Sequence, residues 1–223
     1  MLPPTFLDWW FAPWAHASGR TPCLPSAIDQ LGRRDGYRLW CAEAGIDPDI
    51  PLHFDPAWHI AATADGTEFI ATARLFAGLL AARDHDQAVL GALPFADRKW
   101  CVSIAATQPL QRCSHVRYDG GESIEVRGMV ELARRLEHGF PGLWGRLRLT
   151  LPIALADKVD RLRHEAVAME LKLDACATRA QRCWQHCRNR AESMRAAQAA
   201  SDASRDQSDR YTRADHDDAA LAT

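Results

Sequence analysis

Apolar residues recur every three or four positions over much of the chain, which is the spacing of one face of an α-helix. The pattern is clearest in three segments, at 67–83, 126–138 and 155–187. Thr67 is expected to cap the first of them. A further helix is expected after Pro94. Its predicted apolar side carries Phe95, Trp100, Val102 and Ile104. These periods predict a mainly α fold, with a single helical domain and few β elements.

Residues 1–62 have a different composition, with tryptophan and proline close together, and there we expect short helices and ordered loops. Ser26 is a predicted cap for a helix that ends near Leu31. Residues 37–44 form another predicted helix, which Gly45 stops.

Two short segments favour strands. Residues 116–126, "VRYDGGESIEV", place an Asp-Gly turn between weakly alternating residues and predict a small hairpin. Residues 146–151, "RLRLTL", alternate strictly and predict a short strand, with its leucines in the core and Arg146 and Arg148 outward. A helix imposed by tertiary contacts is the alternative for this segment.

After a core domain at 1–152, the apolar spacing alternates between four and three from Leu155 to Cys187, as in the seam of a coiled coil. This predicts one long helix over 153–195. We expect its first half to dock on the domain and its second half, from about Cys176 to Arg195, to project toward a partner. A parallel homodimer would set like charges against each other, whereas an antiparallel pair stays open. Residues 196–223 have few large apolar side chains and are predicted to be disordered.

Composition narrows the function classes. The formal net charge of -2 gives no overall attraction for a polyanion, so we expect no nucleic-acid partner. The first sixteen residues lack a basic start and an unbroken apolar run, and no later stretch suits a bilayer. We therefore expect a cytoplasmic protein without direct membrane insertion, whose seven cysteines are reduced thiols.

Candidate chemistry is sparse. Cys176, Cys183, His186 and Cys187 lie close together in the sequence, but the cysteines occupy seam positions, where small apolar side chains pack, which favours packing over zinc. We find no complete catalytic or phosphate-binding motif, and expect no cofactor, no metal and no enzyme activity. Arg179, Arg182 and Arg188 make the end of the predicted long helix basic. This indicates either an ordinary solvated face or a surface for an acidic partner.

Three stretches together resemble a known family. "WCVSIAATQPLQRC" at 100–113, "LWGRLRLTLP" at 143–152 and "FAPWAH" at 11–16, which is followed by Leu24 and Pro25, are similar to segments of the SctK/YscK family. Members of this family are cytosolic adaptors of the type III secretion sorting platform. The resemblance covers roughly residues 6–152.

The resemblance implies a non-enzymatic cytoplasmic adaptor, peripheral to the inner-membrane secretion apparatus, that links the inner-membrane ring to the sorting-platform pods. The implied partners are the SctQ-like and SctL-like pod proteins and the cytoplasmic domain of the inner-membrane ring protein. An alternative is a small-molecule-binding or hydrolytic helical domain with a site built from loops. The candidate protein-binding residues are Phe11, Pro13, Trp14, Trp144, Arg146, Arg148, Arg179, Arg182 and Arg188.

Overall fold

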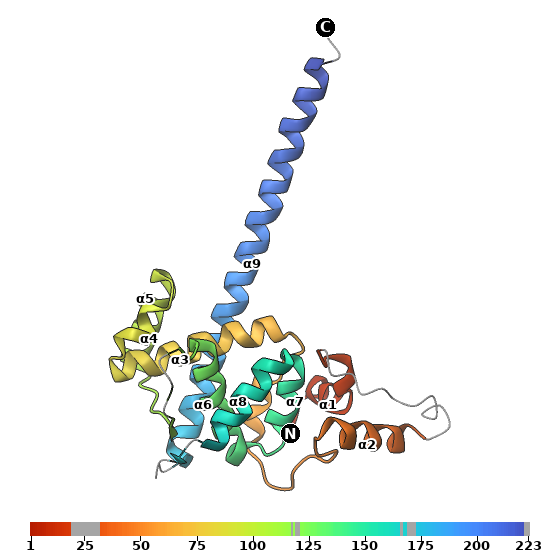
Figure 1. The fold of residues 1–223 in the computed structure, drawn as a ribbon, viewed down its shortest axis with the longest axis vertical. Coiled ribbons are helices and arrows are strands. Elements are labelled where there is room, and N and C mark those ends of the chain that lie inside the picture. Colours follow the sequence, from red (N-terminus) through yellow and green to blue (C-terminus); the bar gives the residue numbers. More distant parts are fainter. Residues whose placement is uncertain (19–31, 117, 119–120, 166, 169–172, 221–223) are drawn as a thin grey trace.

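The computed structural model describes residues 1–18, 32–116, 118, 121–165, 167–168 and 173–220. The structure is mainly helical, as predicted (Figure 1). The first half of the chain forms α1 (Pro4–Phe11), η1 (Pro13–Ala15), α2 (Arg33–Ala44), η3 (Pro56–Ala61), α3 (Gly66–Asp84), α4 (Gln87–Gly91) and α5 (Phe95–Thr107). The second half forms β1 (Ser114–His115), α6 (Ile124–Gly139), α7 (Leu143–Leu147), η4 (Arg148–Thr150), α8 (Ile153–Glu165), β2 (Val167–Ala168) and α9 (Leu173–Ala220).

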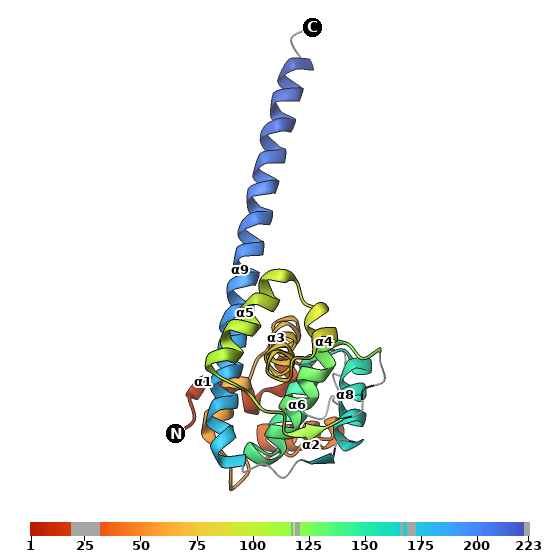
Figure 2. The ribbon, with the colours of Figure 1, turned by 90° about the vertical axis from the view of Figure 1, so that its left-hand side faces the viewer.

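Helix α3 forms the centre of the fold, and α5, α6 and α9 pack around it (Figure 2). Its side chains are buried on nearly every side from Phe69 to Ala81. Trp184 of α9 contacts α3 through Phe69 and Phe76, with ring centroids 5.7 and 5.3 Å apart. Helix α6 approaches α3 closely at Gly128, where an added Cβ would lie 1.9 Å from a backbone oxygen of α3. The core therefore depends on both local apolar patterning and close backbone contacts such as this one.

The helices predicted at 37–44, 67–83 and 126–138 are present as α2, α3 and α6. Gly45 ends α2 with a φ of 65°, as expected of a left-handed cap. The cap predicted for α3 is wrong, because the Asp65 carboxylate, rather than Thr67, accepts hydrogen bonds from the first backbone amides. The helix predicted at 26–31 lies outside the described residues.

Helix α5 forms where predicted, but only part of its predicted apolar side faces the core: Trp100 and Ile104 are partly buried and pack against it. Phe95 is 77% exposed and Val102 is 49% exposed, whereas Asp97, Cys101 and Ala105 are buried. Asp97 tolerates this position because Arg74 and Arg190 supply compensating charge at 3.5 and 3.4 Å. The predicted apolar side of this helix is therefore wrong for Phe95 and Val102 and correct for Trp100 and Ile104.

Neither predicted β segment is confirmed, and the Asp-Gly turn of the first lies outside the described residues. In the described part of 116–126 no hairpin is present, and α6 begins at Ile124. The short strand β1 instead pairs antiparallel with β2. Residues 146–150 are helical, in α7 and η4, and Leu151 follows in an extended conformation. A helix was the alternative interpretation of this segment. The leucines of this segment are buried as predicted, but Arg146 is fully buried rather than outward, because its guanidinium finds backbone oxygens inside the domain.

The helix predicted as continuous over 153–195 is two helices. Helix α8 ends at Glu165 and packs on α6, whereas α9 begins at Leu173 and packs on α3 and η3. The seam residues Val159, Leu162, Ala180, Cys183 and Cys187 are all buried. The second half of the seam therefore docks on its own domain, and the expectation that it projects toward a partner is wrong.

The prediction of disorder after residue 196 also needs correction, because α9 continues as a helix to Ala220 and extends away from the rest of the molecule (Figure 1). The physical reason is local. The α9 sequence contains neither glycine nor proline and is rich in alanine, so its helix propensity is high. Among the described residues no helix is long and apolar enough to cross a membrane.

Candidate interaction site around helix α7

Arg146 joins three separate parts of the chain inside the domain. It follows a tight turn at Gly142, whose φ of 83° favours glycine. The Arg146 Nε donates to the Trp10 carbonyl at 3.2 Å, and Nη2 donates to the Tyr37 hydroxyl at 2.9 Å and the Asp47 carbonyl at 2.8 Å. The guanidinium also lies 3.5 Å from the centroid of the Trp10 ring. One side chain thus connects α1, α2 and the loop after α2 to α7.

The environment of Arg146 keeps its neighbours neutral. Burial, followed by the positive charge of Arg146, lowers the pKa of His16 to about 4. Burial raises the pKa of Tyr37 to about 12, against the opposing effect of Arg146. Burial also lowers the pKa of Arg146 itself, but a guanidinium stays protonated in proteins. At neutral pH the cluster therefore carries one buried positive charge and no titrating partner among these three groups.

An aromatic surface lies on the other side of Tyr37. Phe11 and Trp14 are 45% and 44% exposed, and their rings meet the Tyr37 ring edge-on at 5.6 and 6.3 Å. Pro13 is buried between them in the sequence. We call Phe11, Trp14 and Tyr37 the aromatic surface. It brings the predicted N-terminal site residues next to Arg146, so two of the segments that carry the family resemblance meet in space.

Trp144 and Arg148 share an acidic partner that the sequence did not indicate. The Trp144 indole is buried and donates to Asp160 Oδ1 at 2.7 Å. Arg148 donates to Asp160 Oδ2 at 2.7 Å and to the Ala44 carbonyl at 3.3 Å. Arg163 places its Nη2 3.6 Å from Asp160 Oδ1. Asp160 and Arg163 lie on α8, and no local motif marks either residue.

A groove of about 300 Å³ runs beside these residues, and we call it the α7 groove. Its lining includes Gly45, Gly142, Gly145, Trp144, Arg148 and Arg163. The groove therefore combines an aromatic edge, two guanidinium groups, two carboxylates and three glycines.

The basic residues of α9 lie elsewhere and are partly engaged within the chain. Arg188 donates to the Glu68 carboxylate at 3.0 Å and to the carbonyls of Ile60 and Ala62. Arg179 and Arg182 are exposed and donate only to nearby backbone oxygens among the contacts described, those of Pro109 and Thr178. The structure does not bring these arginines together with α7.

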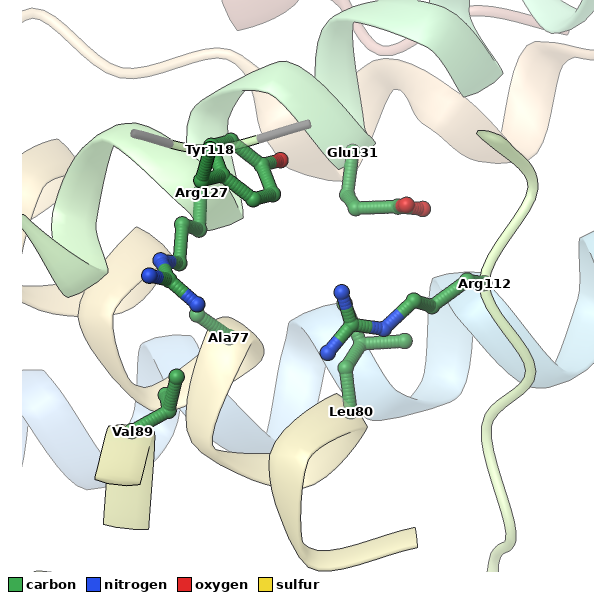
Figure 3. A pocket seen from close by; sticks show the side chains of 7 residues that line it. All are labelled: Ala77, Leu80, Val89, Arg112, Tyr118, Arg127 and Glu131. Carbon is green, nitrogen blue, oxygen red and sulfur yellow. The ribbon is translucent and has the colours of Figure 1, made fainter. Parts of the chain in front are cut away.

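A second, smaller pocket lies between α3, α4 and α6 (Figure 3). Arg112, Arg127 and Glu131 point into it, and the Arg127 guanidinium lies 4.7 Å from the centre of the Tyr118 ring. Burial alone would raise the pKa of Glu131, but Arg135 holds it below its usual range. The cavity measures about 10 Å³, which suits about one water molecule. The cavity is too small for a substrate, and the polar side chains around it form a structural network.

The described part of the chain contains no group of three or more histidine, cysteine or acidic side chains that could hold a metal ion. Cys183 and Cys187 are buried, and burial raises the pKa of both thiols. Both thiols therefore pack in the core, where α9 contacts the rest of the domain. The side chain of Cys176 lies outside the described residues.

Comparison with known proteins gives no relative. No protein-family model matches the chain, and no curated protein and no solved structure matches it either. The resemblance to the SctK/YscK family stays a prediction that rests on the residues quoted for it.

Proposed function

We propose that this protein is a non-enzymatic cytosolic adaptor of a bacterial type III secretion system, which links the inner-membrane ring to the sorting-platform pods. The observation that carries the proposal is the junction at Arg146. Residues 11–16 and 143–152, which carry much of the family resemblance, are more than a hundred positions apart. They are connected through Tyr37, which accepts a hydrogen bond from Arg146 and whose ring contacts Phe11 and Trp14. A shared unit favours a common origin for the two motifs over a chance match of each.

The aromatic surface supports a binding function. Phe11 and Trp14 keep nearly half of their surface exposed although each contacts Tyr37. Large aromatic side chains held in fixed positions are typical anchors of protein interfaces, because they bury much area at little entropic cost. Tyr37 is itself fixed by hydrogen bonds to Arg146 and to the Pro48 carbonyl. The surface is therefore preorganised for a protein partner.

Helix α9 supplies a second contact region, which an adaptor needs. Its part from Ala180 to Ala191 is anchored in the core, and residues 196–220 extend beyond it over roughly 37 Å at 1.5 Å per residue. The side chains at 196–202 are exposed. A helix without packing is only marginally stable in water, so a partner along this part would stabilise it. We assign the ring protein and the SctQ-like and SctL-like pod proteins as the partners of these two regions.

The proposal is tested by co-purification of the tagged protein with each of the three partners. A double variant, Phe11→Ser with Trp14→Ser, should lose at least one partner and keep its helical circular dichroism. Phe95→Ser is the matched control, because Phe95 is also an exposed aromatic residue but lies on α5. If the double variant and the control recover all partners equally, the aromatic surface does not bind any of them. Recovery of no partner by the wild-type protein would refute the adaptor function.

A further inference from the structure

Three charged side chains meet at one wall of the α7 groove. Both carboxylate oxygens of Asp160 are occupied, Oδ1 by the Trp144 indole and Oδ2 by Arg148, each at 2.7 Å. Arg163 lies 3.6 Å from Oδ1, which is too long for a good hydrogen bond. Arg163 is thus attracted to a carboxylate that already has two closer donors.

The wall carries an excess of positive charge. Arg148 and Arg163 contribute two guanidinium groups, and Asp160 offsets one of them. Glu137 also lines the groove, but Arg134 pairs with it at 2.7 Å, so that pair is neutral. Arginine is well suited to bind carboxylates because its planar group donates several hydrogen bonds at once.

Three glycines also line the groove, Gly45, Gly142 and Gly145. A Cβ added at these positions would lie 3.4–3.6 Å from Arg148, Trp10 or Ile46, so the glycines mark close packing at this wall. Gly45 and Gly142 have φ values of 65° and 83°, a conformation that other residues rarely adopt, so the absence of side chains follows from the turns. A volume of about 300 Å³ lies at the lower end of binding sites and suits one side chain with its flanking backbone.

We propose that the α7 groove binds a glutamate or aspartate side chain in an extended segment of a partner protein. The partner's carboxylate pairs with Arg163 and is attracted by the charge of Arg148, whose two terminal nitrogens already donate to Asp160 and to the Ala44 carbonyl. The partner's backbone passes along the glycines that line the groove. Asp160 competes with this carboxylate, because it already draws on both guanidinium groups. The identification of the ligand as part of a protein rests on the proposed adaptor function, whereas the preference for a carboxylate rests on the groove alone.

The probe is a fluorescent peptide in which glutamates alternate with glycine-serine pairs, titrated with the full-length protein and followed by anisotropy. A peptide with glutamine in place of glutamate is the matched control and should bind much more weakly. Arg163→Gln should weaken binding of the glutamate peptide about fivefold, as loss of one partly exposed charge pair does. Arg161→Gln changes an exposed arginine of the same helix that does not line the groove, and should have no effect.

Asp160→Asn separates this proposal from a purely structural role. Asparagine can still accept the hydrogen bond from Trp144 but no longer neutralises the arginines. We expect about fivefold tighter binding of the glutamate peptide, which mere structural damage would not produce. If Asp160→Asn fails to fold, Arg163→Gln decides the question.

The proposal is overturned if the wild-type protein does not bind the glutamate peptide, if the glutamine peptide binds equally well, or if Arg163→Gln binds like the wild type. These outcomes are independent of co-purification. The groove proposal can therefore fail in the peptide assay while co-purification supports the adaptor function. Equally, the peptide can bind as proposed while co-purification refutes the adaptor function.

Discussion

Replacement of Arg146 tests the internal junction on which the arrangement of the interaction site depends. In Arg146→Ala the buried carbonyl of Trp10 and the partly buried carbonyl of Asp47 lose their donor, and an unsatisfied buried acceptor costs about 1–3 kcal/mol. The contact with the Trp10 ring is worth about 2 kcal/mol when desolvated. Removal of a buried charge offsets several kcal/mol of this loss. We expect the free energy of unfolding to fall by about 3 kcal/mol.

Arg146→Lys should not rescue stability, although it keeps the positive charge. An ammonium group is more strongly hydrated than a guanidinium and cannot donate as a planar fork to Trp10, Tyr37 and Asp47 together. Urea unfolding followed by circular dichroism measures both variants, with the exposed Arg161→Ala as a control that should change stability by less than about 0.5 kcal/mol. A loss below about 1 kcal/mol for Arg146→Ala, or wild-type stability of Arg146→Lys, would refute the junction.

Three further predictions follow from the same contacts. A chain that ends after Ala175 should not fold, because it lacks the buried part of α9, whereas one that ends after Asp202 should keep its melting temperature; equal melting of both would contradict this assignment. Trp144→Ala should cost about 3–5 kcal/mol and Trp144→Phe about 2 kcal/mol, since the second mainly removes the indole donor, and equal losses in urea unfolding would argue against that hydrogen bond. The folded-state pKa of His16 is about 4, below its value of about 6.5 in an unfolded chain, so its contribution is complete above pH 6.5 and is lost as the pH falls toward 4, by up to about 3 kcal/mol. His16→Phe should remove this part of the pH dependence, and parallel stability curves for variant and wild type would show the assignment to be wrong.

The long helices were predictable because their apolar period extends over several turns, as in α3 and α6. The segment at 146–151 was not, because alternation cannot show whether the residues between the leucines point outward. There Arg146 is buried as well, and its partners come from residues about a hundred positions away. The burial of Asp97 on α5 was not predictable for a similar reason, since it depends on arginines from α3 and α9.

The interruption between α8 and α9 was also invisible in the sequence pattern. Both helices turn their seam residues to one core, so the spacing of four and three continues across the break. Burial of the seam was therefore predictable, but the number of helices was not. The residues after 196 were predicted to be disordered because they include few large apolar side chains. They are helical to Ala220, since a segment without glycine and proline can still have a high helix propensity.

Part of the interaction site could be identified from the sequence. Trp144 and Arg148 were candidates, and the structure places both at the α7 groove. Tyr37, Asp160 and Arg163 were not candidates, because each gains its role from a contact with a distant element. A single tyrosine, aspartate or arginine on a helix gives no signal before that contact is known.

The central claim is that the protein bridges the membrane ring and the pods. The most direct test is sequential capture from cells that carry the secretion system, first through a tag on the ring protein's cytoplasmic domain and then through a tag on the SctQ-like protein. The account predicts that both captures recover the protein in one complex, and that deletion of its gene leaves the second capture without ring protein. Recovery of the same ring-pod complex in the deletion strain would contradict the account.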